Sequence, residues 1–165
     1  MGDRTITDRL QPSLLDRLRD DAPESETESR EARVVDLKRL REIVRRDLAS
    51  LLNTTNIETL HDMEAHPHVA RSTLNYGIVD VAGSGATSMK TKEIRLMIRK
   101  AIERFEPRIL PGTLEVVQRT EAGDIRATVY FDIRGELWAQ PLPVQLYLRS
   151  ELDATSGEFR LEQAG

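Results

Sequence analysis

An amphipathic helix that must end at a proline is the feature that most limits how this chain can fold. Apolar residues upstream of Pro107 recur at the spacing of one helical face, and they are Ile94, Met97, Ile98, Ala101, Ile102 and Phe105. Proline lacks an N–H and disfavours helical backbone in the residue before it, so the helix must end before Pro107. The sequence therefore predicts a helix over residues 90–105 with one buried face.

This helix is followed by an acid, although the dipole of a helix favours cations at its C-terminus. The acid is Glu106, and Pro107 and Arg108 come directly after it. The arrangement predicts a constrained ion pair between Glu106 and Arg108, either within the chain or across an interface. The residues leave a solvated surface salt bridge, worth at most about 1 kcal/mol, equally open.

The hydrophobic period changes beyond Pro111-Gly112 from that of a helix to that of a strand. Apolar and polar residues alternate over residues 114–116, 125–134 and 144–149, with a hairpin loop at 121–124; a short segment, 159–162, follows the turn at 155–157. A second helix is predicted over residues 34–52, and its inward residues are Leu37, Leu40, Val44, Leu48 and Leu51. Together these elements predict an α+β fold, with two main helices packed on an antiparallel sheet of about four strands.

The N-terminal part of the chain differs from the rest. Residues 1–20 hold leucines spaced for one face of a short helix, whereas residues 21–33 are acidic and poor in apolar side chains. We therefore expect an N-terminal docking helix (1–20), a flexible acidic linker (21–33) and one α+β domain (34–165). Docking on a partner is favoured over core packing because the linker separates the leucines from the domain.

Composition excludes several classes of function. The chain has no cysteine, so it has neither disulfides nor thiolate chemistry. Its formal charge of −4 argues against nonspecific binding to nucleic acid. No apolar run is long enough to cross a membrane or to direct secretion, so we expect a cytoplasmic protein without membrane insertion.

Two segments suggest cofactor or metal sites only weakly. The first has four potential metal ligands, His61, Glu64, His66 and His68, but Pro67 interrupts their helical spacing and no zinc motif is matched. The second, residues 83–91, lacks the glycine that a phosphate loop needs before Lys90. We expect no metal and no cofactor. The lone tryptophan, Trp138, fits either the core or an interface.

Four short motifs between residues 13 and 109 carry a resemblance that runs over residues 13–157. They are Ser13-Leu14-Leu15-Asp16-Arg17-Leu18, Arg46-Asp47-Leu48 with Leu51-Leu52-Asn53-Thr54, Asn75-Tyr76-Gly77, and Phe105-Glu106-Pro107-Arg108-Ile109. Together they resemble the baseplate wedge family shared by contractile-tailed phages and type VI secretion systems. The chain departs from that family at Ile78-Val79, where Leu-Pro is common, and at Thr55, where arginine is often found.

The resemblance implies a structural subunit of a contractile injection machine, of the kind found in phage and type VI baseplates. In the family the Glu-Pro-Arg motif contacts a helical bundle of larger wedge subunits. Residues Glu106, Pro107 and Arg108 are therefore expected to bind TssF and TssG, together with the N-terminal Leu14, Leu15, Asp16, Arg17 and Leu18. TssK is expected to be reached through the wedge.

The resemblance also implies a second partner for the C-terminal sheet, which is similar to the interlocking domain of sheath subunits. Phe159 and Leu161 in the last strand are expected to meet the sheath subunits TssB and TssC in the first ring and so to start sheath assembly. An edge strand offers unpaired N–H and C=O groups for such strand addition.

A peptidoglycan hydrolase is the alternative function, because the family was historically labelled lysozyme-like. Glycoside hydrolysis needs two carboxylates, about 5 to 10 Å apart, around a cleft. Glu106 is one candidate, but Asp80, Asp132 and Glu136 are all plausible as surface acids and none is singled out as its partner. We therefore expect no enzymatic activity.

Overall fold

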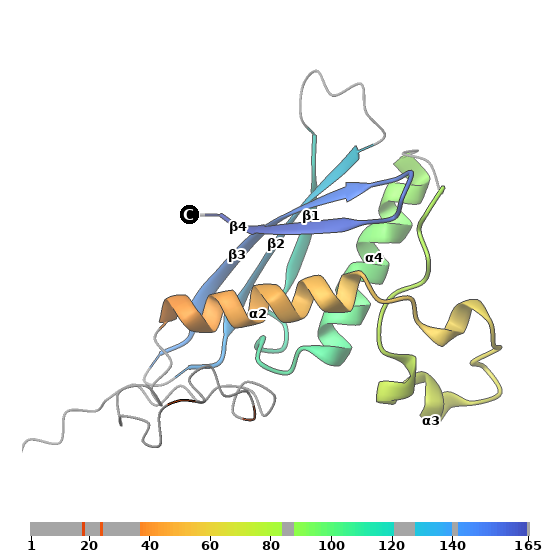
Figure 1. The fold of residues 1–165 in the computed structure, drawn as a ribbon, viewed down its shortest axis with the longest axis horizontal. Helices are drawn as coiled ribbons and strands as arrows, with labels where there is room; N and C mark the ends of the chain where they lie inside the picture. Colours follow the sequence, from red (N-terminus) through yellow and green to blue (C-terminus); the bar gives the residue numbers. More distant parts are fainter. Residues whose placement is uncertain are drawn as a thin grey trace, which may run out of the picture.

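The computed structural model describes Leu18, Glu24 and residues 37–83, 88–120, 128–139 and 142–164. Its main elements are two long helices, α2 (Leu37–Leu52) and α4 (Ser88–Phe105), and four strands, β1 (Glu115–Arg119), β2 (Thr128–Leu137), β3 (Val144–Asp153) and β4 (Phe159–Gln163). Three short helical turns, η1 (Ile57–Thr59), α3 (Pro67–Ala70) and η2 (Thr73–Asn75), connect α2 to α4 (Figure 1). The predicted α+β fold is confirmed.

The four strands lie in the sheet in chain order, and each neighbouring pair is antiparallel. The central pair, β2 and β3, is in register from Thr128 opposite Asp153 to Leu137 opposite Val144. The turn from β3 to β4 is closed by Asp153, whose Oδ1 accepts hydrogen bonds from the N–H groups of Thr155 and Ser156. These bonds lower the pKa of Asp153. The predicted turn at residues 155–157 is confirmed.

Both long helices cover the same face of the sheet (Figure 1). α2 packs against β4 and β3, while α4 packs against β1. The largest fully buried side chains are Leu48, Leu51, Leu52, Ile94, Ile98, Ile102, Phe131, Ile133, Leu137, Leu146, Leu148 and Leu152. The core is therefore almost entirely aliphatic, and within the described residues the other face of the sheet has no helix over it.

The helical pattern predicted one residue of α2 wrongly. Leu37 was expected to face inward, but its side chain is 39% exposed because it begins the helix, where no described element covers it. The buried stripe instead includes Ile43 and Leu52. Strand β2 runs to Leu137, further than the alternation predicted.

Several other expectations fall on residues outside those the structure describes. They concern the docking helix and linker apart from Leu18 and Glu24, residues 34–36 of the first predicted helix, and the hairpin loop at 121–124. None of the helices in the described ranges is both long and apolar enough to cross a membrane.

Candidate protein-interaction site

Glu106 and Arg108 form an ion pair within the chain. The N–H of Glu106 makes the last helical hydrogen bond of α4, to the carbonyl of Ile102 at 2.9 Å. Pro107 then turns the chain, so that Arg108 Nε donates to Glu106 Oε1 at 2.7 Å and Arg108 Nη2 donates to Oε2. The main-chain N–H of Arg108 also donates to Oε1, at 3.1 Å. Because Glu106 is only 4% exposed, this is a buried bidentate pair and not a solvated surface bridge.

A second carboxylate, Asp47 of α2, binds the same guanidinium. Arg108 Nη2 donates to Asp47 Oδ2 at 2.7 Å, and Arg46 donates to Asp47 Oδ1 at 2.8 Å. Burial alone would lower the pKa of Arg108, but hydrogen bonds and negative charge from Glu106 and Asp47 outweigh burial and raise it. Arg108 is therefore a permanent cation that ties the end of α4 to α2.

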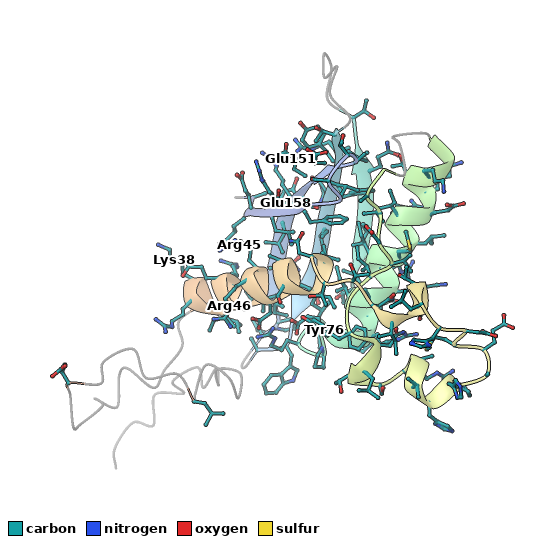
Figure 2. All side chains as sticks on the ribbon, turned by 45° about the vertical axis from the view of Figure 1, so that its right-hand side comes forward. Lys38, Arg45, Arg46, Tyr76, Glu151 and Glu158 are labelled. Atoms are coloured by element: carbon teal, nitrogen blue, oxygen red, sulfur yellow. The ribbon has the colours of Figure 1, made fainter. Side chains whose placement is uncertain are left out.

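The Asn75-Tyr76-Gly77 loop packs against this ion pair. The ring of Tyr76 meets that of Phe105 edge to face, with 5.3 Å between the ring centroids. Burial raises the pKa of the Tyr76 hydroxyl, and the negative charges of Asp47 and Glu106 add to that effect. Figure 2 shows Tyr76 beneath the C-terminal half of α2 and beside α4. Three of the four sequence motifs thus meet at one place in the fold.

Gly77 allows the loop to lie directly on the end of α2. Its φ is 116°, and a Cβ there would lie 2.1 Å from the carbonyl oxygen of Thr54. On either side of this contact, Ile78 N–H donates to Thr54 O and Asn56 N–H donates to Ile78 O, both at 2.9 Å. These bonds fix the turn that the motif predicts, even though Ile78-Val79 replaces the family's Leu-Pro.

Side chains anchor the same loop on its other side. Asn75 is fully buried, and its Nδ2 donates to Glu58 Oε1 at 2.6 Å and to the carbonyl of Ala70 at 3.0 Å. Arg104 of α4 donates to the same carbonyl at 2.6 Å. The loop is therefore bonded to the short turns that precede it, and α4 bonds those turns through the same carbonyl of Ala70.

Trp138 lies on the surface next to Arg108, which answers the question the sequence left open. Trp138 directly follows the end of β2, and its main-chain N–H donates to the carbonyl of Arg108 at 2.7 Å. The side chain of Trp138 is 55% exposed, Leu142 nearby in the chain is 73% exposed, and Pro107 is exposed as well. Trp138 is thus not part of the core, and the Glu-Pro-Arg turn has an exposed aromatic neighbour that no sequence pattern pointed to.

The other predicted partner-binding residues are placed less favourably or lie outside the described residues. Phe159 and Leu161 of β4 are only 2% and 5% exposed, with their side chains in the core. Of residues 14–18, the structure describes Leu18 alone, which is 73% exposed.

Asp132 is not a surface acid, contrary to expectation. It lies on the uncovered face of the sheet, yet it is only 7% exposed because three side chains cover it. Tyr147 Oη donates to Asp132 Oδ2 at 2.9 Å, Arg134 donates to the same oxygen at 3.2 Å, and Arg119 Nε lies 3.6 Å from Oδ1. Glu106, in the helical layer, is on the other side of the sheet. Arg134 is on the same strand as Asp132, but Tyr147 and Arg119 come from the two neighbouring strands, and periodicity does not reveal such cross-strand neighbours.

The histidine segment shows no metal-binding geometry. His61, Glu64, His66 and His68 are all exposed. Across the residues whose placement is described, no group of three or more His, Cys, Asp or Glu side chains is arranged to hold a metal ion.

Comparison with known proteins supplies a family. The family described as "Baseplate wedge protein gp25" matches residues 38–142, a range that includes α2, the Asn75-Tyr76-Gly77 loop, α4 and the residues around Arg108. No curated protein and no solved structure is significantly similar to the chain. The match covers well over half of the 165 residues, so the chain belongs to the gp25 family of baseplate wedge proteins.

Proposed function

We propose that this baseplate wedge protein is the TssE-type subunit of a type VI secretion baseplate, working in the cytoplasm as a structural adaptor without cofactor or catalysis. In this proposal TssF and TssG are its direct wedge partners, and TssK is reached through them. The observation that carries the proposal is the convergence of Asp47, Tyr76 and Glu106, each from a different motif, on the single cation Arg108. This arrangement ties α2, the Asn75-Tyr76-Gly77 loop and the end of α4 together and uses both oxygens of Glu106 in hydrogen bonds to Arg108.

The same geometry argues against the hydrolase alternative. Both carboxylate oxygens of Glu106 accept hydrogen bonds from Arg108, so this acid is not free to donate a proton to a glycosidic oxygen. Of the candidate second acids, Asp132 is on the far side of the sheet and Asp80 Oδ1 accepts from the N–H of Ala82. We therefore retain the expectation of no enzymatic activity.

The wedge partners are proposed to bind the exposed residues around the Glu-Pro-Arg turn. Glu106 is buried, so it acts by positioning Arg108, whose side chain is 25% exposed. Pro107 precedes Arg108 in the chain, the main chain of Trp138 bonds that of Arg108, and the side chains of Pro107 and Trp138 are exposed. Tryptophan and arginine are the residues that most often dominate binding energy at protein interfaces. We define Pro107, Arg108 and Trp138 as the wedge face.

Replacing Trp138 by alanine should weaken binding of TssF–TssG at least about thirtyfold, which corresponds to about 2 kcal/mol for a central aromatic anchor. The melting temperature of the isolated chain should change little, because the side chain is exposed. Leu60→Ala, at an 80% exposed apolar residue on the connection between α2 and α4, is the matched control and should bind normally. Co-purification and titration with TssF–TssG measure both. Wild-type affinity in Trp138→Ala would refute this wedge face.

The sheath contact is proposed to form at the β1 edge of the sheet. Residues Glu136 and Trp138 direct their main-chain groups toward the β1 side, where they bond Leu110 and Arg108. Main-chain N–H and C=O groups point to alternate sides along a strand, so those of Asp132 and Tyr130 also point toward β1. Their register partners, Val117 and Arg119, therefore bond β2.

The intervening residues of β1, Val116 and Gln118, direct their N–H and C=O groups away from the sheet. Among the described residues no hydrogen bond reaches these outward groups. Unpaired groups along an edge are the template that strand addition uses. We therefore infer that a sheath strand adds along β1, whereas the sequence predicts the sheath contact at β4.

Gln118→Pro tests this contact, because it removes one outward N–H and leaves the bonds between β1 and β2 in place. Sheath assembly on baseplates that carry this variant should fall to background, while wedge formation and the melting temperature stay close to wild type. Gln118→Ala keeps the N–H and should support normal sheaths. Sheaths of normal number and length on Gln118→Pro baseplates, counted by electron microscopy, would exclude the β1 edge.

A further inference from the structure

One side chain of α2 bonds the main chain of the edge strand β4 as a neighbouring strand would. Oδ1 of Asn53 accepts the N–H of Phe159 at 2.9 Å, and Nδ2 of Asn53 donates to the carbonyl of the same residue at 2.8 Å. A side-chain amide has the same donor and acceptor as a peptide group. Asn53 therefore satisfies both outward main-chain groups of Phe159.

Two arginines of α2 continue this row. Arg45 donates to the carbonyl of Leu161 at 3.2 Å, and Arg41 Nε donates to the carbonyl of Gln145 at 3.1 Å. Arg41, Arg45 and Asn53 are spaced by four and eight residues, so they lie on one face of the helix. Figure 2 shows Arg45 between α2 and the strands. Gln145 belongs to β3 beyond the end of β4, so the row also closes the edge that β4 leaves uncovered.

The bonded groups are those that an added strand would need. Glu158 O and Ala164 N bond β3, through Asp153 N and Tyr147 O. By the alternation along a strand, Phe159, Leu161 and Gln163 direct their main-chain groups to the open side of β4. α2 occupies both groups of Phe159 and the carbonyl of Leu161. By contrast, nothing in the described part of the chain occupies the corresponding groups of β1.

We propose that Asn53, Arg45 and Arg41 form an edge guard that prevents β4 from pairing with β4 of a second copy of this chain. A bare terminal edge strand of alternating residues is a template for such pairing, and two identical antiparallel edges are self-complementary. Of the two edges of the described sheet, the guard leaves β1 open to strand addition. This inference concerns the isolated chain and does not depend on the proposed function.

The guard residues differ in what else they do, which decides the choice of variants. Asn53 Nδ2 also donates to the carbonyl of Ala49 at 2.9 Å and so caps α2. Arg45 has its bond to Leu161 but no role in a helix cap. Arg46, the next residue, bonds Asp47, so Arg46→Met is a control with the same loss of charge.

The experiment compares the wild-type chain with Asn53→Ala, Arg45→Met, their double variant and Arg46→Met. Hydrogen exchange at the amide of Phe159 should be about fivefold to tenfold faster in Asn53→Ala, the effect of losing one hydrogen bond. Sedimentation equilibrium should show a larger dimer fraction in the double variant than in the wild type or Arg46→Met at every concentration, and this increase reports on β4 because β1 is unchanged in all four proteins. Adding Gln163→Pro, which removes an outward N–H of β4, should reverse the dimerisation.

Three results would overturn the guard. The first is unchanged exchange at Phe159 in Asn53→Ala. The second is a double variant that stays as monomeric as the wild type, which would make the contact structural only. The third is self-association that Gln163→Pro does not reverse, because it would then not use the β4 edge. If Asn53→Ala fails to fold, Arg45→Met alone decides, since it keeps the helix cap. No wedge or sheath protein is present, so failure here leaves the proposed function standing.

Discussion

Replacing Arg108 by alanine should destabilise the isolated chain by about 3 to 5 kcal/mol, the usual cost of leaving a buried carboxylate without its cation. Glu106 is 4% exposed, and its two carboxylate oxygens accept three hydrogen bonds from Arg108, two of them from the guanidinium. Asp47 loses the same partner. At about 2 to 4 °C per kcal/mol for a chain of this size, the melting temperature should fall by about 10 °C. Thermal unfolding, monitored by circular dichroism, measures this decrease in melting temperature.

Two further substitutions distinguish the effect of losing a cation at a buried site from that of losing a cation at an exposed site. Arg46→Ala also takes a cation from Asp47, but at an exposed site, and it should cost no more than about 0.5 kcal/mol. Arg108→Lys keeps the charge and loses the bidentate fork, so its melting temperature should lie between those of Arg108→Ala and the wild type. If Arg108→Ala melts at the same temperature as the wild type, the ion pair does not contribute the stability expected of a buried pair.

This expectation changes how assembly defects are interpreted. Glu106→Gln and Arg108→Ala each remove one partner of this ion pair. With Glu106 buried beneath Arg108, loss of wedge binding in either variant would also follow from loss of stability. Trp138→Ala is therefore the more direct test of the wedge face.

The elements of the fold were predictable because burial repeats along the chain with a local period. Ile94, Ile98 and Ile102 recur every four residues and are all buried in α4. Phe131 and Ile133 alternate with polar residues and are fully buried in β2. The sequence therefore predicts which face of each element is apolar, and the packing of helices on one side of the sheet follows from those faces.

Contacts between distant elements were not predictable in the same way. Nothing local shows that Asp47 would bind Arg108, 61 residues further along the chain. The burial of Asp132 depends on Tyr147 in the next strand, and the role of Asn53 depends on Phe159 lying beside the end of α2. Such pairs are set by how the elements pack, and a single sequence records only the periodicity of each element.

Replacing Gly77 by alanine should destabilise the chain by about 4 kcal/mol or more. A φ of 116° costs an ordinary residue about 1 to 3 kcal/mol. The new Cβ would also lie 2.1 Å from Thr54 O and 2.8 Å from Thr54 C, so the loop must move away from α2. That movement breaks the bonds of Ile78 N–H and Asn56 N–H, each worth about 1 kcal/mol. Urea unfolding of the purified chain measures the sum.

Gly112→Ala separates the steric clash from the backbone strain. Gly112 has a φ of 81°, but a Cβ there meets nothing within 4 Å, so alanine should cost only the conformational part, about 1 to 2 kcal/mol. Equal destabilisation by Gly77→Ala and Gly112→Ala would show that the loop does not lie against α2. A second measurement follows the site itself: if Gly77→Ala folds, displacement of the loop should expose Tyr76 and bring the raised pKa of its hydroxyl down toward its ordinary value. Spectrophotometric titration should therefore show Tyr76 ionising at lower pH in Gly77→Ala than in Gly112→Ala, because only Gly77→Ala moves the loop away from α2.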